Sequence, residues 1–215
     1  MRSQVVDVDG FGPDDVCRLL NVSSDVTDRI AAYLDLLFLW NQRINLIGPS
    51  EHRHIWRRHV LDCLQLANDI RPGDVRIADF GSGAGLPGLV LALAASESRK
   101  VFLVEKSPRK SEFLAAAIKD LNLNAEVVTS RLEAISLPAV DVITARALAP
   151  LSKLLGYAET LVHRDSLCLF LKGRDVENEL TDARESWTFS LSARPSLSSP
   201  EGQVLAISSL ARRPR

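Results

Sequence analysis

The feature that most constrains this chain is a glycine-rich stretch between two apolar runs, "IADFGSGAGLPGLVLA", at residues 77–92. Glycine lets the backbone take left-handed turns and approach another molecule without a Cβ in the way. Such a loop between a strand and a helix is typical of proteins that hold a nucleotide-like ligand. A tight turn with no ligand is the simpler alternative. Acidic residues that follow two successive predicted strands favour the ligand site.

From residue 75 onward, short apolar runs alternate with longer amphipathic segments, a pattern typical of parallel strands joined by crossover helices. Strands are expected at 75–80, 100–105, 125–130, 141–146, 166–172, 187–193 and 203–210, and helices from Pro87, from Pro108, over 150–162 and over 177–185. The Pro- and Ser-rich loop between the last two strands is short enough for a hairpin. The predicted fold is α/β, a doubly wound Rossmann-like sheet that is mostly parallel with an antiparallel terminal strand.

Residues 13–70 instead have helical periodicity, with apolar residues at Val26, Ile30, Leu34 and Leu37. "GPSE" at 48–51 is typical of a break followed by a new helix start. We therefore expect two or three helices there. The predicted organisation is an N-terminal helical segment at 1–70 and a sheet domain at 71–215, forming one compact unit.

Composition narrows the class of protein. With 215 residues, of which 46% are hydrophobic, the chain can bury one sizeable core. The net charge of −1 means that any site for a polyanion must be a local patch. Cys17, Cys63 and Cys168 lie far apart with no CxxC pair, which favours reduced thiols. The sequence contains neither the apolar core of a signal peptide nor a run long enough to span a bilayer, so we expect a cytoplasmic protein that contacts no membrane. No apolar helical stripe is left over, and a monomer is expected.

The glycine loop fits two cofactor chemistries. Read as G-x-G-x-x-G, it matches a dinucleotide-binding loop, with Glu105 22 residues after Gly83 as the ribose-binding acid. Read as D-x-G-x-G-x-G, from Asp79 through Gly81, Gly83 and Gly85, it matches the first motif of S-adenosylmethionine (SAM) methyltransferases. A pyrophosphate disfavours a neighbouring anion, whereas SAM carries an ammonium and a sulfonium. Asp79 therefore favours SAM.

Charged side chains also follow the other predicted strands, where open α/β sheets bind ligands. They are Glu105, Arg131, Glu133, Arg146 and Lys172. For Glu105 taken alone, the alternative to a ligand contact is an ordinary charge at a strand end.

Several separated segments together resemble one family. In order along the chain they are "LFLWNQRINLIG" (37–48), "RRHVLDCL" (57–64), "DFGSGAGLPGLVLA", "SPRKSEFL" (107–114), "SRLEAI" (130–135), "ITARALAPL" (143–151) and "FLKG" (170–173). This set resembles the RsmG (GidB) family, which uses SAM to methylate guanine N7 in small-subunit (16S) ribosomal RNA. The resemblance spans about residues 37–173. The family usually has Ser where this chain has Cys63, so a small thiol replaces that hydroxyl.

The resemblance implies positions for the cofactor. Gly81 and Leu86, with Gly83 and Gly85 between them, fall where the family's glycine loop meets SAM. Leu132 and Glu133 fall where backbone and carboxylate flank the adenine. Arg146 falls where an arginine reaches the site, and it can contact SAM, contact the guanine or pair with Asp79 or Glu133. Carboxylates such as Glu133 and Glu105 can accept hydrogen bonds from the adenine amino group and the ribose hydroxyls.

Guanine N7 can attack the SAM methyl group directly, because N7 carries a lone pair and no proton. No general base is needed, and "ARALAP" stands where exocyclic-amine methyltransferases carry Asn-Pro-Pro-aromatic. Catalysis then rests on orientation of a splayed-out base, with Arg146 and Lys172 as the catalytic candidates.

RNA-binding candidates are Arg58, His59, Arg131 and Lys172. "RHIWRRH" at 53–59 offers a basic patch with Trp56 as a stacking ring, and the alternative is a solvated helix face with Trp56 packed inward. His59, Asp62 and Cys63 lie at helical spacings, but no further ligand cluster is visible, so no metal is expected.

The leading hypothesis is therefore a 16S rRNA methyltransferase acting on naked RNA, the small ribosomal subunit or an assembly intermediate. The alternatives are a SAM-dependent methyltransferase with another substrate, a nicotinamide-dinucleotide oxidoreductase and a non-catalytic RNA-binding module.

Overall fold

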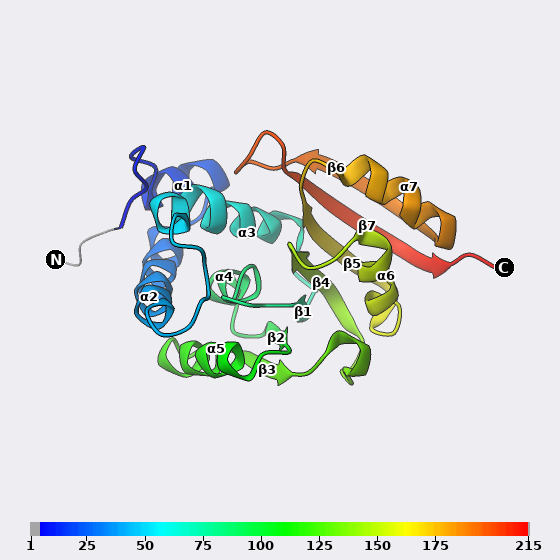
Figure 1. Cartoon of the computed structure of the whole chain (residues 1–215), viewed down its shortest axis with the longest axis horizontal. Helices are drawn as coiled ribbons and strands as arrows, with labels where there is room; N and C mark the ends of the chain where they lie inside the picture. Colours follow the sequence, from blue (N-terminus) through cyan, green and yellow to red (C-terminus); the bar gives the residue numbers. More distant parts are fainter. Residues whose placement is uncertain (1–4, 215) are drawn as a thin grey trace.

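A computed structural model describes residues 5–214 of the chain, so the ends of the expected segments 1–70 and 71–215 lie outside the described residues. Its centre is a seven-stranded sheet with the order β3-β2-β1-β4-β5-β7-β6 (Figure 1). The strands are β1 Arg76–Phe80, β2 Lys100–Glu105, β3 Ala125–Thr129, β4 Val140–Arg146, β5 Val162–Lys172, β6 Trp187–Pro195 and β7 Gln203–Arg212. β1 to β5 pair in parallel, and β7 pairs antiparallel with both β5 and β6. The predicted doubly wound, mostly parallel sheet with an antiparallel terminal strand is confirmed.

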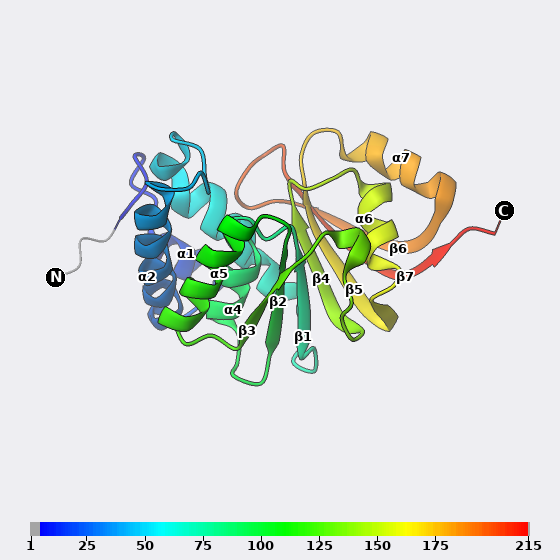
Figure 2. The same ribbon diagram turned by 60° about the horizontal axis from the view of Figure 1, so that its bottom comes forward.

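Helices cover both faces of this sheet. Before β1 lie α1 Pro13–Leu20, α2 Ser24–Asn41 and a helical stretch at 51–69 made of η1 Glu51–His54, η2 Trp56–Leu61, α3 Asp62–Leu64 and η3 Gln65–Asp69. After β1 lie α4 Gly88–Ala94, α5 Pro108–Asp120, η4 Leu132–Ala134, α6 Leu151–Ala158 and α7 Val176–Ser186. In Figure 2, α1, α2, α4 and α5 lie on one side of the sheet and α6 and α7 on the other.

The strands read as near-continuous apolar runs because both faces are buried. Alternate residues enter different cores: Ile77 packs with the N-terminal helices, α4 and α5, whereas Ala78 and Phe80 pack in the cluster that holds α6 and α7. The N-terminal helices therefore share one hydrophobic cluster with the sheet.

Two helix boundaries and the start of β5 differ from the prediction, since β5 begins at Val162 instead of residue 166. The helix expected over 150–162 ends at Ala158, because the chain turns there and Val162 already pairs with Val140 in the sheet. The helix expected from Pro87 begins at Gly88, with Pro87 in the N-cap position.

The strand order reverses between β1 and β4, and the loops after these two strands diverge at the carboxyl edge of the sheet. Open α/β sheets bind ligands at such a point. The hairpin loop between β6 and β7 reaches the same edge, where Leu197 N donates to Gln65 Oε1 at 3.1 Å. No helix among the described residues is long and apolar enough to cross a membrane.

Candidate active site

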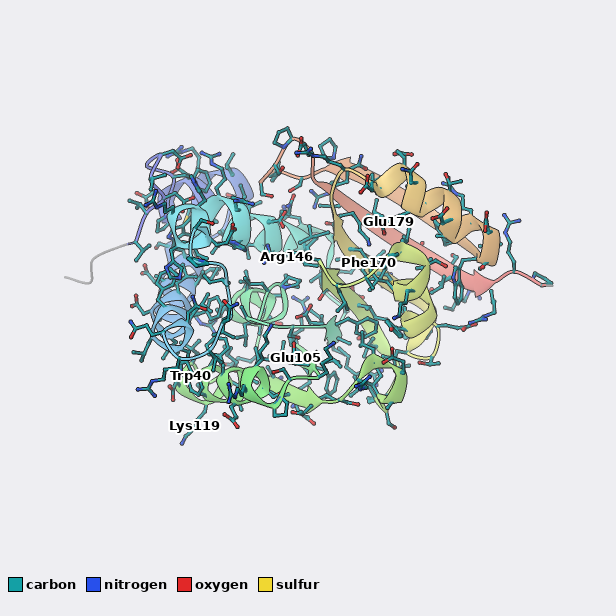
Figure 3. The ribbon with its side chains drawn as sticks, in the orientation of Figure 1. Trp40, Glu105, Lys119, Arg146, Phe170 and Glu179 are labelled. Carbon is teal, nitrogen blue, oxygen red and sulfur yellow. The ribbon has the colours of Figure 1, made fainter. Side chains whose placement is uncertain are left out.

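Two cavities open side by side at the carboxyl edge and share a wall made of Ala147, Leu148 and Ala149. The first, of about 470 Å³, is lined by the glycine loop and is called the glycine-loop cavity. The second, of about 700 Å³, is lined by Arg146 and residues of the helical stretch 51–69 and is called the arginine cavity. Figure 3 shows Arg146 near the centre of the molecule, between the N-terminal helices and β5. The shared wall follows β4 directly, and Ala147 has a φ of +50°, which is uncommon for a residue with a Cβ.

A buried carboxylate, that of Asp79, holds the glycine loop in place. Asp79 accepts hydrogen bonds from Gly88 N at 3.1 Å and from Thr144 Oγ1 at 2.8 Å. Burial raises the pKa of Asp79 to about 6. A Cβ on Gly88 would lie 2.7 Å from Asp79 Oδ2, so only glycine fits there. Asp79 has no exposed surface and lines neither cavity, so it positions the loop rather than touching a ligand.

Two further side chains fix the same loop. The Tyr33 hydroxyl, from α2, donates to the carbonyl oxygen of Ala84 at 2.6 Å. Glu105, at the end of β2, accepts from Gly83 N at 2.9 Å through one oxygen and from Ser107 N at 2.8 Å through the other. The loop is therefore shaped by groups from the N-terminal helices and from the neighbouring strand.

The glycine-loop cavity brings together six of the predicted residues. They are Gly81, Gly83, Glu105, Arg131, Leu132 and Glu133. Gly85 and Leu86 lie in the same loop but not on the cavity wall. The wall also contains residues that sequence reasoning missed: Lys106, Lys110, Ser130, Lys153 and Tyr157. The Tyr157 hydroxyl donates to Glu133 Oε1 at 2.7 Å, and this hydrogen bond lowers the pKa of Glu133.

Arg146 turns into the arginine cavity, away from Asp79 and Glu133. Its Nη2 donates to Nδ1 of His59 at 2.9 Å, and its Nη1 lies 3.4 Å from the carbonyl oxygen of Arg58 and 3.7 Å from Asp62 Oδ2. Of the alternatives left open for Arg146, pairing with Asp79 or Glu133 does not occur, because helical residues from 58–62 take up its guanidinium at the end of β4.

His59 is neutral in this arrangement. Its Nε2 lies 2.6 Å from Glu51 Oε2, and its Nδ1 accepts from Arg146, which assigns the proton to Nε2. Burial and the Arg146 guanidinium lower the pKa of His59 to about 4. The order Glu51, His59, Arg146, Asp62 thus forms a continuous polar row along the cavity.

The remaining walls are also tied by polar contacts. Asp62 Oδ1 accepts from Ser196 Oγ at 2.9 Å and from Ser198 Oγ at 2.6 Å, which binds the β6–β7 loop to the helical stretch. Lys172 Nζ donates to the Ala149 carbonyl oxygen at 2.7 Å and to Glu179 at 2.5 Å. The side chain of Lys172 is only 9% exposed, so it braces the shared wall.

One pair of alternatives for the helical stretch has a clear outcome. The Trp56 side chain is 1% exposed and its indole N–H donates to the Val5 carbonyl oxygen, so the stacking ring is wrong and Trp56 packs inward. Cys63 is fully buried, and burial raises the pKa of its thiol. Among the described residues, Asp7, Asp9 and His54 are close enough to share a cation, but both oxygens of Asp7 already accept from Trp56 N and Arg57 N.

Comparison with known proteins adds sequence and fold relatives. Residues 27–204 match the family GidB, described as rRNA small subunit methyltransferase G. The chain is 42% identical over 202 residues to "Ribosomal RNA small subunit methyltransferase G" of Paramagnetospirillum magneticum, covering 94% of this chain and 98% of that protein. It is 40% identical over 210 residues to the protein of the same name in Caulobacter vibrioides NA1000, covering 97% and 94%.

Solved structures share the fold at lower identity. An O-methyltransferase from Bacillus cereus in complex with SAH has a TM-score of 0.60 at 14% identity, covering 92% of this chain and 96% of that one. Cofactor-bound Rv0187 from MTB has a TM-score of 0.59 at 16% identity, covering 92% and 97%.

Proposed function

The chain belongs to the rRNA small subunit methyltransferase G (GidB) family, and from that premise we propose that it transfers the methyl group of SAM to N7 of a guanine in 16S ribosomal RNA. The observation that carries this proposal is the pair of cavities that meet at the point where the strand order reverses. One cavity has the glycine loop and the acids that suit SAM, and the other has the cationic group that suits RNA. The family membership favours this function over the dinucleotide alternative.

The glycine-loop cavity fits SAM by the chemistry of its walls. Glu105 and Glu133 offer carboxylate oxygens to the ribose hydroxyls and the adenine amino group, and the backbone at Gly81 and Gly83 allows close approach. Leu132 lies beside Glu133 as an apolar surface for the adenine ring. Bound SAM supplies a methyl group on a positively charged sulfur.

The chain's own residues then orient the base. The arginine cavity is larger than a purine needs, so it also has room for part of the sugar–phosphate backbone. Arg146 is held by His59, and neutral His59 is not required as a base because N7 carries no proton. Catalysis comes from holding N7 in line with the methyl group across the shared wall.

Exposed cations around both cavities suit the RNA phosphates. Arg58 lies at the rim of the arginine cavity, and Lys106, Arg131 and Lys153 surround the glycine-loop cavity. These groups form a local basic surface on a chain whose net charge is −1. Lys172 supports the site through Ala149 rather than through a phosphate. The proposed partner is the small ribosomal subunit or an assembly intermediate. We propose that a monomer binds it, and that the enzyme works in the cytoplasm with this substrate.

The proposal is tested with small subunits that lack their own N7 methylation. They are incubated with the protein and methyl-deuterated SAM, and their nucleosides are analysed by mass spectrometry. Labelled 7-methylguanosine is expected. No label in guanosine, with SAM binding intact by calorimetry, would overturn the assigned substrate.

A further inference from the structure

Asp62 and Arg146 place a hydrogen-bond acceptor beside a donor on the wall of the arginine cavity. Asp62 Oδ1 is occupied by Ser196 and Ser198. Among the contacts of residues 5–214, Asp62 Oδ2 accepts no hydrogen bond, and it lies 3.7 Å from Arg146 Nη1. Both side chains are mostly buried, at 15% and 19% exposure, so a ligand that meets them is shielded from water.

The charges around this pair disfavour a phosphate there. Neutral His59 adds no positive charge, and Glu51 and Asp62 lie on either side of Arg146 along the polar row. Arg58 pairs with Glu51 at 3.2 Å, so each of the two guanidinium groups here has a carboxylate partner and the cluster carries no net charge. A neutral group with an acceptor next to a donor fits better than an anion.

The edge of guanine has this pattern. O6 is an acceptor, and the adjacent N1–H is a donor. Adenine presents the reverse order, with an amino donor next to an acceptor at N1. An arginine beside a carboxylate is therefore complementary to guanine and leaves both groups mismatched against adenine.

Resting on the function proposed above, we propose that Asp62 is the specificity-determining residue for guanine, accepting the base N1–H through Oδ2 while Arg146 donates to O6. O6 lies between N1 and N7 on the rim of the base. With N1 at Asp62 and O6 at Arg146, N7 stays free of protein contacts. The residues that follow Arg146 are the shared wall, so this orientation turns N7 toward the glycine-loop cavity.

The test measures binding of nucleoside monophosphates to the full chain saturated with S-adenosylhomocysteine, by calorimetry. Wild type is expected to bind GMP about tenfold or more tighter than AMP. It is expected to bind 1-methyl-GMP no tighter than AMP, because that probe lacks the N1–H. This comparison needs no mutation. Equal affinity for GMP and 1-methyl-GMP, or no GMP binding at millimolar concentration, overturns the proposal.

The second part of the test repeats these binding measurements on Asp62→Asn. The serine hydroxyls keep the Asn carbonyl oxygen on their side, which turns the amide NH₂ toward the base. The GMP-to-AMP affinity ratio is expected to fall by about tenfold or more. Ser198→Ala is the matched control, because it removes a contact of the same carboxylate on the other oxygen. It is expected to keep the ratio.

An unchanged ratio in Asp62→Asn, with wild-type melting temperature and S-adenosylhomocysteine affinity, overturns the proposal. The deuterated-methyl assay separates this failure from failure of the proposed function. If wild type labels guanosine at N7 while Asp62→Asn has the same GMP-to-AMP affinity ratio as wild type, the proposed function stands and only the role assigned to Asp62 is wrong.

Discussion

Arg146, the last residue of β4, donates to Nδ1 of His59 at 2.9 Å and so joins the end of the sheet to the N-terminal helical stretch. The bond requires a neutral imidazole, which burial ensures. It also fixes the direction of the guanidinium, since the other histidine nitrogen is held by Glu51. The orientation of the proposed RNA-facing arginine is therefore set by residues about 90 positions earlier in the chain.

Replacing Arg146 with Ala is expected to lower methyl transfer by about 100-fold or more while the fold is kept, because the group that orients the base is lost. Affinity for S-adenosylhomocysteine, measured by calorimetry, should stay within a few-fold. Arg164→Ala is the control, since Arg164 is an exposed arginine at the opposite end of β5. Near-normal turnover of Arg146→Ala would remove this residue from the active site.

Asp79→Asn is expected to stabilise the protein at neutral pH. The Asn oxygen can accept from Gly88 N and its NH₂ can donate to Thr144 Oγ1, so the variant keeps both contacts without a buried charge. The pKa of Asp79 in the folded protein is about 6, above its ordinary value of 3.8. Ionisation of Asp79 therefore costs stability above pH 6, and this cost disappears as the pH falls through 6 toward 3.8.

The measurement is urea unfolding of both proteins between pH 5 and 8. The variant should exceed wild type by on the order of 1 kcal/mol near pH 7, with a smaller difference at pH 5. A difference that is constant over this range would show that Asp79 does not titrate there. SAM affinity at pH 7 is expected to fall in the variant, because a negative charge beneath the loop favours a cationic cofactor.

Gly83→Val is expected to abolish SAM binding. Gly83 has a φ of +56°, a conformation that β-branched residues avoid. A Cβ there would have only the Gly81 carbonyl oxygen nearby, at 3.7 Å, so the penalty comes from the backbone and not from a clash. Gly83→Asn separates the two reasons for glycine, because Asn tolerates the left-handed region but still adds a side chain on the cavity wall, and it should lose less affinity than Gly83→Val. Unchanged affinity in Gly83→Val would refute the assignment of the loop.

Lys172→Met separates a wall-bracing role from an RNA-binding role. Removing the ammonium leaves Glu179 with only Leu151 N as a donor and the Ala149 carbonyl oxygen without the donation from Lys172. The free energy of unfolding is expected to fall by about 2 kcal/mol. The salt dependence of RNA binding should not change, whereas Arg58→Ala should reduce its slope. A reduced slope in Lys172→Met would instead support the phosphate contact expected from sequence.

Most of the sheet could be predicted because its strands are apolar runs with clear ends, whereas β5 begins at Val162, before the expected residue 166, and includes the polar residues 163–165. β2 matches its predicted range, and β4 begins one residue earlier than expected. Helix ends were less accurate: nothing local in the sequence marks that α6 stops at Ala158, since that end depends on where β5 joins the sheet. The division into 1–70 and 71–215 stays a prediction, and the shared hydrophobic cluster favours folding as one unit.

The glycine-loop cavity was largely predictable because its residues follow successive strands, and topology brings such residues together. The arginine cavity could not be predicted from the sequence. Glu51, Asp62 and Ser198 come from separate elements, and no spacing links them in sequence. Trp56 illustrates the same limit, since a helical pattern does not say which face of a short helix meets the core.

The hydrogen bond from Tyr33 to Ala84 has a consequence for how this enzyme can be divided. The sheet domain has a fold that many proteins share, which suggests that it could function without the N-terminal helical segment. Here the N-terminal helical segment supplies the fully buried Tyr33 hydroxyl to the glycine loop. Through His59 and Asp62 it also supplies one side of the arginine cavity. A fragment covering 71–215 would therefore lack one side of the arginine cavity and the hydroxyl that holds the loop of the glycine-loop cavity, so the two segments can be inherited or transplanted only together.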